Sequence, residues 1–529
     1  MKKFLWIFAV VALVVLVACS MKTGNASRRA GNLDPLILRA HFIGTEQLFA
    51  APDSRHLKEL GVLKSAAALR EQLAARFAIL PSFWLGDILP QNAPAQTNLF
   101  RPLIEDLLAR ESYLDCTATP DLLLAVKLPD DRARLWQTNL WQALSNWKLG
   151  APATASFGGY SGFEVKRTAL PGVIRGVRAG EWFVLSAGSG KFARETEVLA
   201  NIKSMGRPAK ATGAWLDGDA NLARFEGWLP ALTNLQNLPI AHFSLSNRAD
   251  FVRTYVTLDF AQPHGWKPEP WKIPTNLIHE PLISFVAMRG LAPIFESFAS
   301  LRYLELKPTP NQIIGWGYGG VPFQFNYAVP FSGARDELKK MEPKLRELLL
   351  GRNHLGFSGP LRLTTNGQEI IWNAFPGPVP HFSPVKDAGQ EFLVVNCFPP
   401  MGGTSAPPQL YQAFVGRSDM AVFDFELTSM RVPHWRQFYQ LAEIGSSRPL
   451  SGTNTPFQGW IIEASPKLGE AVTELRVNSP AQMTSVRKST IGLTAIELVT
   501  LGRWLDSTNF PAFGVFPPAP KRAAVPQRK

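Results

Sequence analysis

Cysteine is scarce in this chain. Among 529 residues the only cysteines are Cys19, Cys116 and Cys397. A disulfide-stabilised scaffold carries a much denser set, so this class of protein is excluded. Cys116 lies in a stretch without a clear pattern, whereas Cys397 shares a strand face with Leu393 and Val395 in the alternation of residues 390–398. We therefore predict that Cys397 is a buried free thiol.

Complete catalytic motifs are also lacking. Gly159-Tyr160-Ser161-Gly162 resembles a nucleophile elbow, but the glycine two residues after the serine is missing. Gly188-Ser189-Gly190-Lys191 resembles part of a phosphate loop, without its first glycine or its final Ser or Thr. Residues 217–221 (DGDAN) begin like a calcium loop, but Leu222 and Trp228 occupy the glycine and glutamate positions. These segments are interpreted as turns, a loop before a helix, and a strand end.

The eight histidines are scattered, and none stands at the spacing of a known metal motif from another His, Cys or acid. The sequence therefore predicts no metal, no cofactor and no catalytic residue. Residues distant in the sequence still converge in a folded protein. Carboxylate pairs for glycoside hydrolysis, for example, need only lie about 5 to 10 Å apart in space. A hydrolase with dispersed catalytic residues thus stays open as an alternative.

Acidic residues are fewer than basic ones, which gives a formal net charge of +13. Part of this excess lies in Lys2, Lys3 and the last nine residues, so the folded body is only modestly basic. Such a surface suits anionic lipid or cell-wall polymer, and it also keeps a protein soluble. No basic stripe is interleaved with aromatic residues, so no nucleic acid partner is expected. The 15 tryptophans suit either sugar stacking or burial in a core.

Long apolar runs are absent except at the start of the chain. Lys2 and Lys3 precede the uncharged, proline-free residues 4–18, a pattern typical of a secretory signal. This run is shorter than the ~20 residues that span a bilayer. An ordinary cleaved signal and an uncleaved anchor are the two simple alternatives to the interpretation that follows.

Leu16-Val17-Ala18-Cys19 resembles the lipobox of bacterial lipoproteins. The resemblance covers only the leader. It implies that residues 1–18 are removed and that Cys19 is acylated on its thiol and on its new amino group. One acyl chain holds a protein marginally, whereas two or three hold it stably. Ser20, in place of aspartate, implies the outer membrane, with the protein facing the periplasm.

The rest of the composition is that of a globular protein, with 46% hydrophobic and 18% charged residues. A polar tether is predicted at 19–33 and a proline-rich, basic, disordered tail at 510–529. Alternating segments such as 251–260 predict half-buried strands, and helices are predicted between them. Residues 79–103 are rich in proline and are interpreted as irregular. Together these patterns predict an α+β fold with largely antiparallel sheets backed by helices.

Asn366-Gly367 gives the clearest local prediction. This dipeptide supplies the positive φ angles of a type I′ turn, so residues 361–365 and 368–375 form a hairpin. Its register pairs Leu363 with Ile370 and Leu361 with Trp372.

The order of elements repeats along the chain. Residues 34–44 (DPLILRAHFIG) match 280–290 (EPLISFVAMRG). Further matches, in the same order, join 122–147 to 323–350, 159–162 to 356–359, Asp217 and Asp219 to Asp424 and Glu426, and 243–260 to 460–477. These matches predict a tandem duplication, with similar domains at 34–279 and 280–509. This region loosely resembles large bacterial exported proteins with tandem α+β repeats, and that resemblance implies no activity.

We therefore expect a lipid-tethered protein of the cell envelope with a binding or structural role and without catalytic activity. Its expected partners are the membrane, through the lipid anchor, and cell-wall polymer or an envelope protein. Two similar surfaces would suit an extended or bivalent partner. A deep cleft with convergent carboxylates, or His near Ser, would instead favour the hydrolase. Shallow grooves lined by Trp and Arg would favour binding.

Overall fold

The computed structural model describes residues 36–84, 95–117, 122–166, 172–188, 192–225, 237–297, 302–319, 324–351, 361–364, 369–372, 380–398, 403–445, 454–508 and 510–511. Cys19, the leader, the tether and most of the predicted tail lie outside these residues. Lipid attachment and the envelope location therefore stay predictions. Within the described residues, no helix has both the length and the apolar character needed to cross a membrane.

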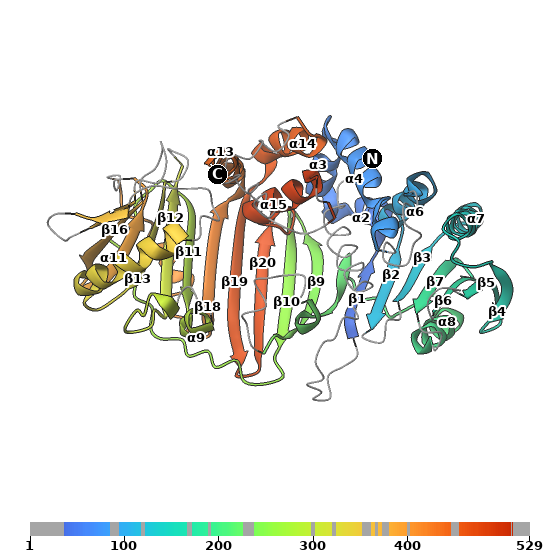
Figure 1. The fold of residues 1–529 in the computed structure, drawn as a ribbon, viewed down its shortest axis with the longest axis horizontal. Coiled ribbons are helices and arrows are strands. Elements are labelled where there is room, and N and C mark those ends of the chain that lie inside the picture. The colour runs from blue at the N-terminus through green and yellow to red at the C-terminus, as the bar shows by residue number, and fades with distance from the viewer. Residues whose placement is uncertain are drawn as a thin grey trace, which may run out of the picture.

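The strands form one continuous antiparallel sheet along the long axis of the molecule (Figure 1). The N-terminal half contributes β1 (Leu36–Phe42), β2 (Ser112–Thr117), β3 (Leu122–Lys127), β4 (Ala153–Phe157), β5 (Tyr160–Lys166), β6 (Val173–Ala179), β7 (Trp182–Gly188), β8 (Leu216–Asn221), β9 (Ile240–Arg248) and β10 (Phe251–Asp259). The C-terminal half contributes β11 (Leu282–Arg289), β12 (Gln312–Tyr318), β13 (Phe325–Pro330), β14 (Leu361–Leu363), β15 (Ile370–Trp372), β16 (His381–Asp387), β17 (Gln390–Asn396), β18 (Met420–Leu427), β19 (Glu470–Ser479) and β20 (Gln482–Ser489).

Backbone pairing fixes the order of the strands. The N-terminal half runs from its edge to the middle as β4-β5-β6-β7-β3-β2-β1-β8-β9-β10. β10 then pairs with β20, and the C-terminal half continues as β20-β19-β18-β11-β12-β13-β17-β16-β15-β14. Read outward from the middle, each strand of one half takes the place of the strand numbered ten higher in the other. The predicted α+β fold with an antiparallel sheet is confirmed, but the halves share one sheet instead of having one each.

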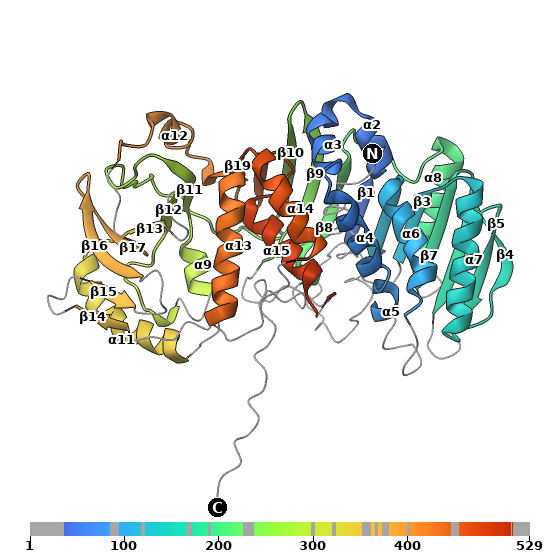
Figure 2. The same ribbon diagram turned by 90° about the horizontal axis from the view of Figure 1, so that it is seen from above.

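Helices cover both faces of this sheet. They are α2 (Gly44–Ala50), α3 (Arg55–Gly61), α4 (Ala66–Phe77), α5 (Leu80–Trp84), α6 (Thr97–Ala109), α7 (Asp130–Asn146), α8 (Ala193–Met205), α9 (Ala292–Ser297), α11 (Ala334–Gly351), α12 (Pro408–Gln412), α13 (Thr428–Gly445), α14 (Pro456–Ala464) and α15 (Ala495–Asp506). Figure 2 shows α4, α6, α7, α13, α14 and α15 along one face, with α8 and α12 on the other. Short 3-10 turns, η1 (Pro52–Ser54), η2 (Leu222–Phe225) and η4 (Ser465–Lys467), complete the elements.

The largest core lies between the sheet and the first of these helix layers. It combines side chains of the N-terminal half, such as Phe77 and Trp136, with side chains of the C-terminal half, such as Trp460 and Trp504. Phe77 and Trp504 are in ring contact, with centroids 6.2 Å apart. A smaller core forms under α8, and another under α12. Many of the tryptophans are therefore core residues.

The alternation of β10 is confirmed by its burial. Val252 is fully buried, whereas Tyr255, on the other face, is 42% exposed. The hairpin register is confirmed as well, because Leu363 pairs with Ile370 and Leu361 with Trp372. The Asn366-Gly367 turn itself lies outside the described residues.

Two expectations about elements are wrong. Residues 97–109 form helix α6 in spite of Pro102, because Phe100, Leu103, Ile104 and Leu107 on this helix bury their side chains. Packing outweighs the single hydrogen bond that the proline removes. The match of 243–260 to 460–477 is also shifted, because Trp460 lies in helix α14. By strand order, the partners of β9 and β10 are β19 and β20.

The two cysteines of the described fold differ from the prediction. Cys116 lies in strand β2 and is 2% exposed, so it is the buried thiol. Cys397 directly follows β17 and is only half-buried, although its burial still raises the pKa of the thiol. Both are free.

Candidate functional site

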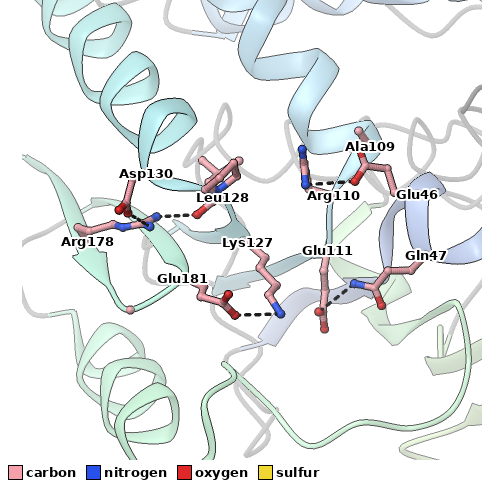
Figure 3. A pocket seen from close by; sticks show the side chains of 12 residues that line it. Glu46, Gln47, Ala109, Arg110, Glu111, Lys127, Leu128, Asp130, Arg178 and Glu181 are labelled. Carbon is pink, nitrogen blue, oxygen red and sulfur yellow. Dashed lines mark hydrogen bonds and ion pairs between the residues drawn. The ribbon is translucent and has the colours of Figure 1, made fainter.

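A charged pocket of about 550 Å³ opens where connections of the N-terminal half meet, at the ends of strands β2, β3, β6 and β7. Figure 3 shows its side chains arranged around a common opening. They come from α2, from the α6–β2 and β3–α7 connections, and from the β6–β7 turn. The lining residues are Glu46, Gln47, Ala109, Arg110, Glu111, Lys127, Leu128, Pro129, Asp130, Arg178, Gly180 and Glu181.

Ion pairs run around this charged pocket (Figure 3). Lys127 Nζ lies 3.1 Å from Glu181 Oε2, and Arg178 Nη2 lies 2.6 Å from Asp130 Oδ1. Arg110 Nη1 lies 3.1 Å from Glu46 Oε2. The acid side chains at the mouth are open to water, since Glu181 is 75% exposed and Asp130 is 77% exposed. The mouth therefore carries both signs of charge in solvent-facing pairs.

Glu111 forms the rear of the charged pocket, where its side chain is 5% exposed. His41 Nε2 and Arg207 Nη2 each lie 3.0 Å from Glu111 Oε1. His41 Nδ1 lies 3.1 Å from Asp217 Oδ1 on the other side of the ring. Burial lowers the pKa of His41, but hydrogen bonds and charges of the two carboxylates prevail and raise it to about 9. The same contacts outweigh the burial of Glu111 and lower the pKa of its carboxyl.

Tight local packing holds these elements in place. Gly44 begins α2 with φ +83°, and a Cβ there would lie 2.4 Å from the carbonyl carbon of Arg110. Only glycine combines this backbone conformation with so close an approach. The Thr45 hydroxyl also donates to the Leu108 carbonyl at 2.9 Å, and the Leu128 N–H donates to the Glu181 carbonyl at 2.8 Å.

The carboxylates of Glu46, Glu111, Asp130 and Glu181 converge at the charged pocket, and each is engaged by a basic side chain. No Ser, Thr, Cys, Tyr or His is among its lining residues, so the lining offers no side-chain nucleophile of these types. Glu111 is a poor general acid near neutral pH, because its pKa is lowered. His41 behind it is protonated at that pH and is a poor general base. Within the described residues, no group of three or more His, Cys, Asp or Glu is placed to hold a metal ion.

The motif-like segments of the sequence lie elsewhere. Ser161 is in β5, in the hairpin with β4, and pairs with Ser156 across the strands. Gly188 ends β7, while residues 189–191 and the Gly356–Gly359 turn lie outside the described residues. Asp219 pairs with His242 at 2.6 Å and with Arg39 at 3.7 Å. Asp219 is thus held in ion pairs across the sheet instead of in a calcium loop.

The predicted match of Asp217 and Asp219 with Asp424 and Glu426 is wrong. Arg39 pairs with Asp219 in the N-terminal half, and Phe285 pairs with Phe425 at the corresponding place. The two acid pairs therefore differ by one residue in register and point to opposite faces of the sheet. Glu426 lies under the helices and accepts hydrogen bonds from the Ala495 N–H at 2.6 Å and from the Thr428 hydroxyl at 3.0 Å. Asp424 beside it is half-buried, and the partial loss of hydration, with the nearby Glu426 charge, raises the pKa of its carboxyl to about 7.

Sequence reasoning misses the residues of the charged pocket. His41 and Glu111 are 70 positions apart, and their contact depends on the pairing of β1 with β2. No local spacing signals such a contact. Comparison with known proteins adds nothing, since no family model, curated protein or solved structure matches this chain. Function has to be inferred from the geometry.

Proposed function

We propose that the protein is a non-catalytic binding protein of the bacterial cell envelope and that the charged pocket receives its ligand. One observation carries this proposal: a concave site with charges of both signs, in which the carboxylates are engaged by basic side chains and no Ser, Thr, Cys, Tyr or His is among the lining residues. Its ligand is a polar segment that itself carries both ammonium and carboxylate groups. The peptide parts of cell-wall polymer have this chemistry.

Ion pairs at the mouth make such binding physically easy. A solvent-exposed pair contributes only about 0 to 1 kcal/mol, because water and salt screen it. A ligand carboxylate can therefore take the place of Glu181 at Lys127, and a ligand ammonium can take the place of Arg178 at Asp130. Glu111 stays fixed by His41 and Arg207, so the rear wall keeps its shape while the mouth exchanges partners.

The leader supports an anchored location for this activity. Residues 16–19 fit a lipobox, which would place lipid on Cys19 and the folded body at the periplasmic face of the outer membrane. Replacing Cys19 with Ala would then abolish labelling by a fatty-acid analogue and release the protein from membranes. Unchanged labelling would contradict the anchor.

We also propose that the two halves, at 34–279 and 280–509, are copies of one unit. The matching strand order supports this, as do two equivalent details. Gly44 and Gly290 follow β1 and β11 with φ +83° and +78°. The Leu128 N–H donates to the Glu181 carbonyl, and the Phe331 N–H donates to the Glu391 carbonyl, both at 2.8 Å.

The copies differ at the pocket. A Cβ on Gly290 would lie 2.4 Å from the Trp266 ring, so the indole of the segment between the halves covers this place. Arg289 beside it donates to the carbonyls of Glu269, Arg417, Ser418 and Met420. Trp266 therefore takes the place beside Gly290 that the Arg110 backbone takes beside Gly44, so the surroundings of the two glycines differ between the copies.

Binding to purified cell-wall polymer tests the function. The full chain in detergent should be retained by the polymer at low salt, and retention should fall as ionic strength rises. Lys127→Ala and Asp130→Ala should each weaken retention about fivefold, the effect of losing about 1 kcal/mol. Lys166→Ala is the matched control, because Lys166 is 81% exposed and pairs with Glu164 at 3.5 Å on β5, outside the charged pocket. Equal retention of all four proteins would overturn the proposal.

A hydrolase is the second candidate, and Asp424 favours it. A carboxyl with a pKa of about 7 beside a second carboxyl is suited to proton transfer at neutral pH. Glu426, however, is occupied by the Ala495 N–H and the Thr428 hydroxyl, so only one of the two carboxyls is free to act. Turnover of ester, peptide or glycoside substrates that is lost in Asp424→Asn would establish this candidate instead.

A further inference from the structure

A stretch of the chain itself lies against the C-terminal half as a peptide. Residues 266–272 (WKPEPWK) belong to the connection from β10 to β11 and form neither helix nor strand (Figure 1). Their two prolines favour extended backbone, both at themselves and at the residues before them. The Arg289 guanidinium donates to the Glu269 carbonyl at 2.7 Å, and its carbon lies 4.4 Å from the centre of the Trp271 ring. This stretch is called the inner peptide below.

Two side-chain amides at the start of β12 bind the main chain of the inner peptide. Asn311 Nδ2 donates to the Lys267 carbonyl at 3.3 Å. Gln312 Nε2 donates to the Pro270 carbonyl at 2.7 Å, and Gln312 Oε1 accepts from the Lys272 N–H at 3.1 Å. Contacts of this kind recognise an extended peptide through groups that every peptide has.

The same place in the N-terminal half belongs to the charged pocket. Counted from the glycine that follows the first strand of each half, the pairing of β11 with β12 puts Gln312 where the pairing of β1 with β2 puts Glu111. Asn311 accordingly matches Arg110. Both Arg110 and Glu111 line the charged pocket. The inner peptide therefore shows how a peptide can lie at this place in the fold.

Glu111 has an oxygen available for such a contact. His41 and Arg207 both contact its Oε1 at 3.0 Å. Its Oε2 faces Gln47 Nε2 at 3.4 Å, which is a long hydrogen bond (Figure 3). A carboxylate oxygen can accept two hydrogen bonds. Oε2 can therefore accept a peptide N–H in the way that Gln312 Oε1 does.

The charged pocket also has charges that the matching place does not have. By the pairing of β3 with β2 and of β13 with β12, Pro330 matches Lys127 and Gly333 matches Asp130. Lys127 and Asp130 are among the lining residues, with their ion pairs open to water. A peptide that carries both signs of charge, as the inner peptide does, thus finds partners here in addition to the main-chain contacts.

We infer that the charged pocket binds an extended, proline-containing segment of a partner protein, with basic and acidic side chains two residues apart. Glu111 accepts a main-chain N–H, and Arg110 donates to a carbonyl. Lys127 binds the acidic side chain and Asp130 the basic one. No bond is made or broken. The inference rests on the proposed function for the site itself and adds a polypeptide to its ligands.

Fluorescence anisotropy with a labelled synthetic peptide tests the inference. The probe is the heptapeptide WKPEPWK with blocked ends, and it is titrated with the full chain in detergent. We expect saturable binding that weakens as ionic strength rises. Lys127→Ala and Asp130→Ala should each weaken binding about fivefold. A heptapeptide with glutamine in place of its lysines and its glutamate should bind about tenfold more weakly.

Lys166→Ala is again the matched control and should bind the heptapeptide like the unchanged protein, because its exposed pair lies outside the charged pocket. Equal binding by Lys127→Ala, Asp130→Ala and Lys166→Ala would overturn the inference, since the heptapeptide would then bind elsewhere. Equal binding of the charged and the neutral heptapeptide would overturn it too.

Retention by cell-wall polymer, measured on the same preparation, separates this inference from the proposed function. Retention without binding of the heptapeptide would overturn the inference and leave the proposed function intact. Binding of the heptapeptide without retention would support the inference and remove cell-wall polymer as a ligand. If neither occurs, both are wrong.

Discussion

His41 is the residue whose environment gives the sharpest pH prediction. Its ring lies between Glu111 and Asp217, and the pKa of about 9 exceeds the ordinary value of 6.5. The folded state therefore holds the proton more tightly than the unfolded state. The resulting stability is complete below about pH 6.5 and is lost as the pH rises through 9.

The variant His41→Gln should lack this dependence. Its free energy of unfolding should be lower than that of the unchanged protein at pH 6.5. We expect this difference to shrink by about 2 to 3 kcal/mol between pH 6.5 and 9.5. Urea unfolding at both pH values measures the change. The lowered pKa of Glu111 affects stability only in the acid range, so it does not disturb this window. A constant deficit across the range would show that His41 is not protonated in the folded protein.

The pKa of Asp424 is raised as well, but here the charged form is the one that the fold disfavours. Its carboxyl has a pKa of about 7 in the fold against an ordinary value of 3.8, so the folded state loses stability as the pH rises from 4 to 7. Asp424→Asn should accordingly gain about 2 to 4 kcal/mol relative to the unchanged protein on going from pH 4 to pH 8. Thermal unfolding at the two pH values checks this. A residue that reduces stability in this way is a sign of a functional site.

Register explains why the sequence misleads at the scale of residues. Asp217-x-Asp219 and Asp424-x-Glu426 look equivalent as patterns, and each pair does lie on a strand that occupies the same place in its half. A shift of one residue turns every side chain of a strand to the other face. Composition and spacing contain no information on that shift. Neither the surroundings of Asp424 nor the charged pocket can therefore be predicted without knowing which strands pair.

Helix α15 is stabilised at its N-terminus by a capping box. Thr494 accepts a hydrogen bond from the Glu497 N–H, and the Glu497 side chain accepts from the Thr494 N–H, which is a capping box. Thr494→Ala should cost about 1 kcal/mol of stability. Ile496 lies two residues further along the chain, and its side chain is 38% exposed. Ile496→Ala should therefore reduce the stability far less than Thr494→Ala. Denaturation midpoints of the two variants measure this difference. Equal midpoints would contradict a stabilising role for the capping box.

Elements with strong local signals could be predicted from the sequence, whereas those determined by tertiary packing could not. Asn366-Gly367 gave the register of β14 and β15 correctly because the turn alone determines it. Helix α6 was missed because its proline outweighs its apolar pattern in the sequence. The start of α15 at Ala495 has such a local signal, because Thr494 and Glu497 form the T-x-x-E pattern of a capping box.

At the scale of the whole molecule, the halves interlock. The carboxylate of Glu463 on α14 accepts hydrogen bonds from the N–H groups of Lys64 and Ser65, ahead of α4. Gln72 on α4 in turn donates to Asp506 on α15 at 2.6 Å. The repeated order of elements in the sequence predicted two similar domains, but it contained no sign that strand β10 would pair with β20 in one sheet. That pairing joins residues more than 200 positions apart.

This interlocking leads to a prediction about unfolding. Because β10–β20 pairing and the large core both span the halves, we expect one cooperative transition in which both halves unfold together. Trp460, which is fully buried on α14, contributes to that core. Trp460→Ala should destabilise the protein by about 3 to 5 kcal/mol and lower the midpoint of the single transition without splitting it.

Probes placed in each half provide the measurement. A fluorophore attached to Cys116 or to Cys397 would report on one half, after brief unfolding to expose the buried thiol and with the other cysteine replaced by Ser. The two labelled proteins should show coincident denaturation curves, and both curves should move together in Trp460→Ala. Ile462→Ala, on the same helix but 53% exposed, should leave both nearly unchanged. Two separate transitions, with only the C-terminal probe responding to Trp460→Ala, would mean that the halves are independent domains joined only by a shared sheet edge.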